Sequence, residues 1–294
     1  MERVVVITGV SSGIGNATAR VLMSDGYCVF GSVRKAADAD RLSADWGAAF
    51  VPLIFDVTRQ DEVRSAAEKA RSLLGGGKVV GLVNNAGIAV AGPLIELPAE
   101  ELRRQLEVNL VGVLAVTQAF MPLLREAGTR GGRRPRIINI SSMSGKLALP
   151  FLGPYTAAKH GLEGLSDSLR RELILEGVDV IKIDPGNVAT PIYEKADALD
   201  MSAYFQSPYF EAMNRTRAMI VFQGRRGSPP ERVGRLVLKV LEARNPRPAY
   251  MIGSGFPVWM MRHVLPARTT DRLISSRLGL RRLRAAGQFR GGQV

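Results

Sequence analysis

The sequence contains very little cysteine and histidine. Among 294 residues there is one cysteine, Cys28, and there are two histidines, His160 and His263. A single cysteine excludes an intrachain disulfide, and within an apolar run it is typical of a small buried hydrophobic residue. The two histidines lie far apart in the chain, so the sequence predicts no metal site.

Long apolar runs are also missing. We find no stretch that reaches the roughly 20 apolar residues needed to span a bilayer. The chain enters an apolar run at Arg3 without the charged leader and cleavage site of a secretory signal. With 46% hydrophobic and 23% charged residues, the composition favours an ordered globular protein, and we expect a soluble, cytoplasmic one.

Acidic residues are too few to balance the basic ones, and the net charge is +13. Much of the excess lies in residues 255–294, which hold eight arginines, no lysine and one acid, Asp271. Such a charge run is usually solvated surface, and we expect no nucleic-acid partner. Its leucines leave two further readings open: a segment that folds back on the protein or contacts a second subunit, and peripheral contact with a membrane.

The N-terminal motif is a strand, a glycine-rich turn and a helix. Residues 3–8 (RVVVIT) lack polar alternation, which is typical of a parallel strand covered on both faces. The glycines that follow permit a tight turn against a pyrophosphate, and the helix N-terminus supplies amide donors. A purely structural turn is the alternative. The predicted dinucleotide-binding residues of this turn are Gly9, Ser11, Ser12, Gly13, Ile14 and Gly15.

The end of the second predicted strand, residues 27–33, indicates which nucleotide binds. A carboxylate there would accept hydrogen bonds from the ribose 2′-hydroxyl and repel a 2′-phosphate. Instead Arg34 and Lys35 follow the strand, and an arginine binds phosphate through paired hydrogen bonds. We therefore expect NADP(H) rather than NAD(H), unless both residues simply begin an exposed helix.

Further polar residues follow later predicted strands. Asp56 either accepts a hydrogen bond from the adenine amino group or caps the next helix. Asn109 lies in an apolar helical stretch, where it makes either a structural hydrogen bond or a link to a water behind the active site. The predicted cofactor-contacting residues in these turns are Asp56, Val57, Asn85, Ala86, Gly87, Pro185, Gly186, Val188 and Thr190.

Residues 139–160 carry a hydroxyl, a phenol and an amine in Ser142, Tyr155 and Lys159. Tyr155 and Lys159 are four residues apart, so on a helix they project from the same face. Ser142 follows an apolar run, residues 136–140, that predicts a buried strand. A strand end that faces a helix brings the three groups together. We expect them to act on a carbonyl or alcohol carbon beside a nicotinamide.

Strands and helices alternate at a spacing that predicts a doubly wound, Rossmann-type parallel sheet of about seven strands, with helices on both faces. We assign residues 1–254 to this catalytic domain and residues 255–294 to a basic, partly apolar extension. Residues 191–227 break the alternation after the sixth strand and are rich in methionine and aromatic residues. There they would overhang the ligand side of the sheet, which favours a mobile lid over an apolar substrate.

In order and spacing, these motifs resemble those of the short-chain dehydrogenase/reductase family. The resemblance runs from residue 3 to about residue 190. The basic residues after the second strand and the apolar C-terminal half are similar to the hydroxysteroid and retinol dehydrogenase branch. The matching residues are Thr8-Gly9-x-x-x-Gly13-x-Gly15, Asn84-Asn85-Ala86-Gly87, Asn109, Ser142, Tyr155-x-x-x-Lys159 and Pro185-Gly186.

The resemblance implies a role for each site residue. Tyr155 would be the general acid in reduction and the general base in oxidation, and Lys159 would lower the phenol pKa and bind the nicotinamide ribose. Ser142 would hold the substrate oxygen, and Asn109 would anchor a proton-relay water. Thr190 and Val188 would fix the carboxamide. A homodimer or homotetramer is also implied.

The sequence thus predicts an NADP(H)-dependent oxidoreductase that interconverts a carbonyl and a primary or secondary alcohol. The expected substrate is lipophilic, of a steroid, retinoid or lipid type. The alternative is a non-catalytic sensor or scaffold that binds NADP(H). The intact Ser142, Tyr155 and Lys159 argue against it, because a binding protein needs no such trio.

Overall fold

The computed structural model describes residues 3–129, 133–198, 200–253, 260–261 and 264–281. Its strands form one parallel sheet in the order β3-β2-β1-β4-β5-β6-β7. The chain winds outward in both directions from β1 and β4, so the predicted doubly wound sheet is confirmed. The strands are β1 (Arg3–Ile7), β2 (Cys28–Val33), β3 (Phe50–Ile54), β4 (Lys78–Asn84), β5 (Arg136–Ile140), β6 (Asp179–Pro185) and β7 (Ala249–Ile252).

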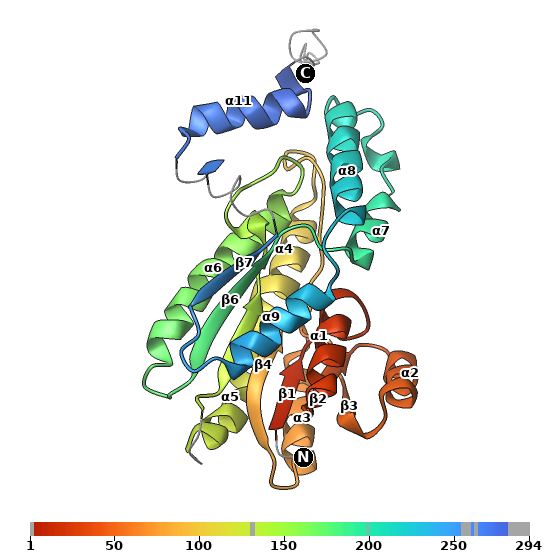
Figure 1. Cartoon of the computed structure of the whole chain (residues 1–294). Coiled ribbons are helices and arrows are strands. Elements are labelled where there is room, and N and C mark those ends of the chain that lie inside the picture. Colours follow the sequence, from red (N-terminus) through yellow and green to blue (C-terminus); the bar gives the residue numbers. More distant parts are fainter. Residues whose placement is uncertain (1–2, 130–132, 199, 254–259, 262–263, 282–294) are drawn as a thin grey trace.

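Helices cover both faces of the sheet (Figure 1). Each face has its own apolar cluster, and the helices divide between the two clusters. One cluster takes up α1 (Gly13–Ser24), α2 (Ala36–Trp46) and α9 (Glu231–Glu242). The other takes up α3 (Gln60–Leu73), α5 (Gly112–Thr129) and α6 (Gly153–Glu172).

Strand β1 shows why the sequence requires both layers. Val4 and Val6 belong to the cluster with α3 and α5, whereas Val5 and Ile7 belong to the cluster with α1 and α9. All four side chains are fully buried. Because successive side chains of a strand point to opposite faces, an unbroken apolar run needs cover on both sides.

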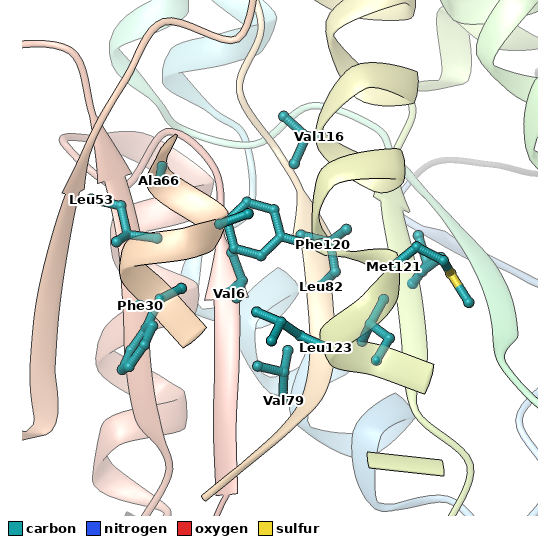
Figure 2. Packing of buried hydrophobic residues seen from close by; sticks show 14 of the residues in the cluster. Val6, Phe30, Leu53, Ala66, Val79, Leu82, Val116, Phe120, Met121 and Leu123 are labelled. Atoms are coloured by element: carbon teal, nitrogen blue, oxygen red, sulfur yellow. The ribbon is translucent and has the colours of Figure 1, made fainter. Parts of the chain in front are cut away.

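The helix that leads into α5 corrects one expectation. Together α4 (Ala99–Leu106), a π-helical turn at Glu107–Val111 and α5 form a helix that, over Ala99–Gly128, is long and apolar enough to span a membrane. We expected no such stretch. Several of its apolar residues pack into the core, among them Val116, Phe120 and Leu123 (Figure 2). A core helix buried against a sheet is as apolar as a membrane span, which explains the hydropathy.

The segment after β6 and the described part of the C-terminal extension lie at the same end of the molecule (Figure 1). The segment comprises α7 (Pro191–Asp197), a turn at Ser202–Tyr204 and α8 (Phe210–Arg225), and α11 (Ala267–Arg277) follows in the extension. Phe151, Met201 and Met213 form a third apolar cluster, against which Leu280 packs. The described end of the extension therefore folds back on this segment, whereas residues 254–259, 262–263 and 282–294 lie outside the described part.

The packing of Phe120 gives a test of the core. The ring is fully buried, so Phe120→Ala leaves a cavity and should lower the free energy of unfolding by about 3–5 kcal/mol. Phe205, which is 63% exposed, is the matched control, and Phe205→Ala should cost about 1 kcal/mol or less. Urea unfolding measures both. Equal losses would contradict the placement of Phe120 in the core.

Candidate active site

The turn between β1 and α1 approaches the neighbouring strand end closely. Gly9 has a φ of +73°, and its N–H donates to Ser32 Oγ at 3.0 Å. A Cβ at Gly9 would lie 3.0 Å from Ala86, and one at Gly15 would lie 2.3 Å from the Gly9 carbonyl oxygen. Ser12 precedes α1 and, within the described chain, its side chain caps none of the helix amides. These amides are therefore available to a ligand.

Strand β4 is fixed to this turn by Thr8 and Asn85. Thr8 Oγ1 accepts from the N–H groups of Asn85 and Ala86 at 2.9 and 3.0 Å. Asn85 Nδ2 donates to the carbonyls of Thr8 and Gly9 at 2.9 and 3.1 Å. The predicted residues of the two strand ends are thus brought together.

Asn109 adopts the structural role that the sequence left open. Its Oδ1 accepts from the Ile88 N–H at 2.9 Å, and its Nδ2 donates to the Ile88 carbonyl at 3.0 Å. Gln105, which sequence reasoning missed, holds the same loop through the Val90 N–H at 2.7 Å and the Ile88 carbonyl at 3.0 Å. Both amides fix the loop that follows Gly87.

Arg34 and Asp56 lie side by side at the ends of β2 and β3. The Arg34 guanidinium is 3.8 Å from Asp56 Oδ2 and is 69% exposed. Asp56 Oδ1 accepts from the N–H and the hydroxyl of Thr58 at 3.0 and 2.8 Å, so Asp56 stabilises the turn before α3. Lys35 directly precedes α2 and is exposed. The Val57 side chain is part of the core.

The turn after β6 lies opposite the glycine turn between β1 and α1. Pro185 ends β6 in register with Ile252 and does not lie in the turn, where we expected it. Proline is tolerated at a strand end because the lost N–H costs little there. Val188 is buried, and a Cβ at Gly13 would lie 3.4 Å from Thr190, which precedes α7. This turn therefore faces the glycine turn.

Ser142, Tyr155 and Lys159 are brought together by β5 and α6. Ser142 Oγ accepts from the Ser144 N–H at 3.1 Å and lies within hydrogen-bond reach of the Tyr155 phenol. Lys159 Nζ donates to the Ile140 carbonyl at 2.8 Å. The same ammonium lies 5.8 Å from the centroid of the Tyr155 ring. The three groups can therefore act on one bound molecule.

The pKa of the Tyr155 phenol shifts upward, whereas we expected Lys159 to lower it. Burial raises the pKa of Tyr155, and the hydrogen bond with Ser142 opposes this rise. We expected the Lys159 charge to lower this pKa, but the largest influence on it is burial, and the ammonium donates to the Ile140 carbonyl. A phenol with a raised pKa is protonated at neutral pH, which is the form that donates a proton.

A chain of buried polar side chains ties β4, β5 and α6 together. Asn84 Nδ2 donates to Asn139 Oδ1 at 2.9 Å, and Asn139 Nδ2 donates to Ser166 Oγ at 2.9 Å. All three residues are buried. This chain fixes the helix that carries Tyr155 relative to the strand that precedes Ser142.

Sequence reasoning missed an acidic group behind Lys159. Tyr155, Lys159, Glu163 and Asp167 follow one another at intervals of four along α6, so they share one face of the helix. That face also meets Asp184, which is fully buried at the end of β6. The four-residue repeat was the signal that could have found Glu163.

The chain is similar to several known proteins. A family profile described as short chain dehydrogenase matches residues 3–199. The chain is 36% identical over 277 residues to the NADPH-dependent 3-dehydrocapnine reductase of Ornithobacterium rhinotracheale, with 92% of this chain and 95% of the relative covered. It is 32% identical over 244 residues to a 3-ketodihydrosphingosine reductase of Bacteroides thetaiotaomicron, with 83% and 85% covered. A short-chain dehydrogenase structure from Streptomyces avermitilis matches with a TM-score of 0.72 at 24% identity, over 99% of each chain.

The glycine turn gives a second test. Because a methyl group at Gly15 would overlap the Gly9 carbonyl and Asn85 Nδ2 at 2.3 and 2.4 Å, Gly15→Ala should destabilise the fold by about 1–3 kcal/mol. Gly164 on α6 has open space around it, so Gly164→Ala should stabilise the fold by roughly 0.5–1 kcal/mol. Thermal unfolding compares them, and a shift of the same sign in both variants would refute the turn geometry.

Proposed function

The chain belongs to the short-chain dehydrogenase family, and on that basis we propose that it reduces the ketone of a long-chain lipid to a secondary alcohol with NADPH. The observation that carries the proposal is the convergence of Ser142, Tyr155 and Lys159 at the ends of β5 and α6. The glycine turn after β1 lies at the same edge of the sheet, because the strands are parallel.

The acid/base step belongs to Tyr155. When bound, the nicotinamide supplies the hydride. Tyr155 donates its phenolic proton to the carbonyl oxygen, and Ser142, within reach of the same phenol, holds that oxygen. The Lys159 ammonium stabilises the phenolate that remains. Asn109 fixes the loop beside these groups and is proposed to anchor the water that returns the proton.

The reductive direction is supported by the protonation of the phenol. Burial raises the pKa of Tyr155, so the site presents a proton donor at neutral pH, as carbonyl reduction requires. Oxidation of an alcohol would need the phenolate as base, which burial disfavours. Both relatives described above are named as reductases.

The arrangement of Arg34 and Asp56 supports NADP(H). The exposed Arg34 guanidinium can bind a 2′-phosphate through paired hydrogen bonds. Asp56 Oδ1 is already engaged by Thr58, so this acid is held in its turn. The amides before α1 would hold the pyrophosphate, and Val188 and Thr190 would hold the carboxamide. The relative from Ornithobacterium is named as NADPH-dependent.

The surroundings of the site support a lipophilic substrate. Leu94, which is 63% exposed, contacts Gly153 two residues before Tyr155. Ile95 and Phe205 are 81% and 63% exposed. Ser207 Oγ donates to Glu96 Oε1 at 2.9 Å and joins the segment after β6 to this loop. We propose that this segment, residues 191–227, is the substrate lid.

The names of the two relatives, a 3-dehydrocapnine reductase and a 3-ketodihydrosphingosine reductase, favour a lipid ketone over a steroid or retinoid. The homodimer or homotetramer and the peripheral membrane contact stay predictions, as does the division of the chain at residue 254.

Removal of one hydroxyl tests the acid/base role. Tyr155→Phe should lower kcat by about 10²–10⁴-fold with NADPH affinity retained, measured as NADPH oxidation in the presence of 3-ketodihydrosphingosine. Tyr250→Phe, which removes a phenol from β7, should leave kcat unchanged. Full activity in Tyr155→Phe would disprove the assignment, and a wild-type protein that binds NADPH without any turnover would favour a sensor or scaffold.

Cofactor choice is tested at Arg34. Arg34→Ala should weaken NADPH binding by roughly 10- to 100-fold, the worth of a charge-assisted hydrogen bond, and leave NADH binding unchanged. Arg41→Ala, which removes an exposed arginine from α2, is the control and should alter neither affinity. Fluorescence titration measures both cofactors. Equal loss for NADPH and NADH in Arg34→Ala would contradict contact with the 2′-phosphate.

A further inference from the structure

One turn of α6 beyond Lys159 lies a buried group of charged side chains. Glu163 Oε2 forms ion pairs with Lys146 Nζ and with Lys182 Nζ, the latter at 2.9 Å. Asp184 Oδ2 lies 3.5 Å from Lys146 Nζ. Lys182 Nζ also contacts Asp167 Oδ1 at 2.9 Å. The group thus joins α6, β6 and the turn after β5.

In the two most buried acids of this group, Glu163 and Asp184, three of the four carboxylate oxygens make no hydrogen bond among the described residues. Glu163 and Asp184 are 9% and 0% exposed and lie within hydrogen-bond reach of each other. Within the described part of the chain, Glu163 Oε1 and both Asp184 oxygens have no hydrogen-bond donor. Two adjacent buried carboxylates repel each other, and a single proton held between them removes one charge and supplies the missing donor.

Gly145 lies close to Glu163 and to the backbone of Lys159. A Cβ at Gly145 would lie 3.1 Å from Ser141 Oγ, 3.1 Å from the Lys159 carbonyl oxygen and 3.2 Å from Glu163 Cγ. Ser141 therefore packs beside the pair, and the backbone of Lys159 lies next to it. Lys146, whose ammonium faces both acids, has a side chain that is 27% exposed.

We propose that Glu163 and Asp184 form a proton-sharing carboxyl pair that acts as the positioning partner of Lys159 and keeps its ammonium charged in the buried site. The proposal rests on the function proposed above, in which that charge stabilises the Tyr155 phenolate. Glu163 and Asp184 are positioning residues, because they act through Lys159.

Lys159 needs such a partner. The residue is 6% exposed, and its ammonium donates to a neutral carbonyl, that of Ile140. Burial lowers the pKa of Lys159 to about 8, and the charges of Asp184 and Glu163 oppose this fall. The other cations of the group, Lys146 and Lys182, already face acids. Removal of either carboxylate therefore favours a neutral Lys159.

The Glu163–Asp184 pair gains its second negative charge near pH 7, just below the pKa of Lys159. Burial and the Glu163 charge raise the pKa of Asp184 to about 7, against the opposing charge of Lys146. The pair therefore carries one negative charge below about pH 7 and two above it. This second charge appears as the pH approaches the pKa of Lys159, about 8. Because it attracts the ammonium, it extends the pH range in which Lys159 stays protonated.

The pH dependence of turnover tests the link to Lys159. The probe reaction is NADPH oxidation with 3-ketodihydrosphingosine dispersed in detergent. Wild-type kcat should fall as the pH rises through about 8. In Asp184→Asn and in Glu163→Gln this fall should move to lower pH by about one unit. Asp167→Asn removes the same charge one turn farther along α6 and should leave the profile in place. Folded Asp184→Asn and Glu163→Gln proteins with the wild-type profile would overturn the proposal.

A second measurement needs no turnover. Folded Asp184 holds a proton up to about pH 7, whereas the unfolded chain loses it near its ordinary pKa. The folded state therefore binds more protons, and this group lowers stability as the pH rises. Between about pH 5 and about pH 7.5 the urea midpoint of Asp184→Asn should rise relative to wild type, and that of Asp167→Asn should not.

The two measurements separate the two proposals. If the urea midpoints of wild type and Asp184→Asn change with pH in the same way, the pair holds no proton. That result would overturn the proposed carboxyl pair, whether or not the protein is active. A wild-type protein that reduces no ketone, yet shows the gain of Asp184→Asn with pH, would contradict the proposed function and support the carboxyl pair.

Discussion

The site depends on one hydrogen bond, from the Lys159 ammonium to the carbonyl of Ile140 at 2.8 Å. It joins α6 to the end of β5 and so sets where Tyr155 stands relative to Ser142, the residue two positions after the strand. The bond places a cation in a buried position, which is costly unless opposite charge lies near. In the carboxyl pair proposed above, the acids one turn along the helix and at the end of β6 supply that opposite charge. The hydrogen bond from Asn139 Nδ2 to Ser166 Oγ also joins β5 to α6.

The fold could be predicted because its signals are local. The unbroken apolar run at residues 3–8 requires cover on both faces, and the turns that hold Gly9, Asn85 and Gly186 each follow a parallel strand. The trio of Ser142, Tyr155 and Lys159 was predicted for the same reason, since a four-residue interval fixes a helix face. The features that sequence reasoning predicted wrongly or missed depend on which residues surround a side chain in the folded protein. The pKa of Tyr155 reflects its burial, and Glu163 meets Asp184 only after the 20 intervening positions have folded into a helix and a strand.

Some polar residues hold the backbone of the site in shape through their side chains. Asn109 was left between a structural role and a water-binding role, and its side chain holds both backbone groups of Ile88. Asp56 likewise stabilises its turn through Thr58. A buried polar side chain needs partners, and the nearest backbone usually supplies them. Sequence patterns locate such residues well, but which partner each one takes is decided by the folded neighbours.

The central claim is that this site transfers hydride to a ketone carbon. The most direct test incubates the protein with 3-ketodihydrosphingosine and NADPH deuterated at both positions of nicotinamide C4, and then analyses the product alcohol by mass spectrometry. We predict one deuterium at the carbinol carbon for each NADPH oxidised. Oxidation of NADPH without deuterium in the product, or tight binding of NADPH with no alcohol formed, would contradict the claim.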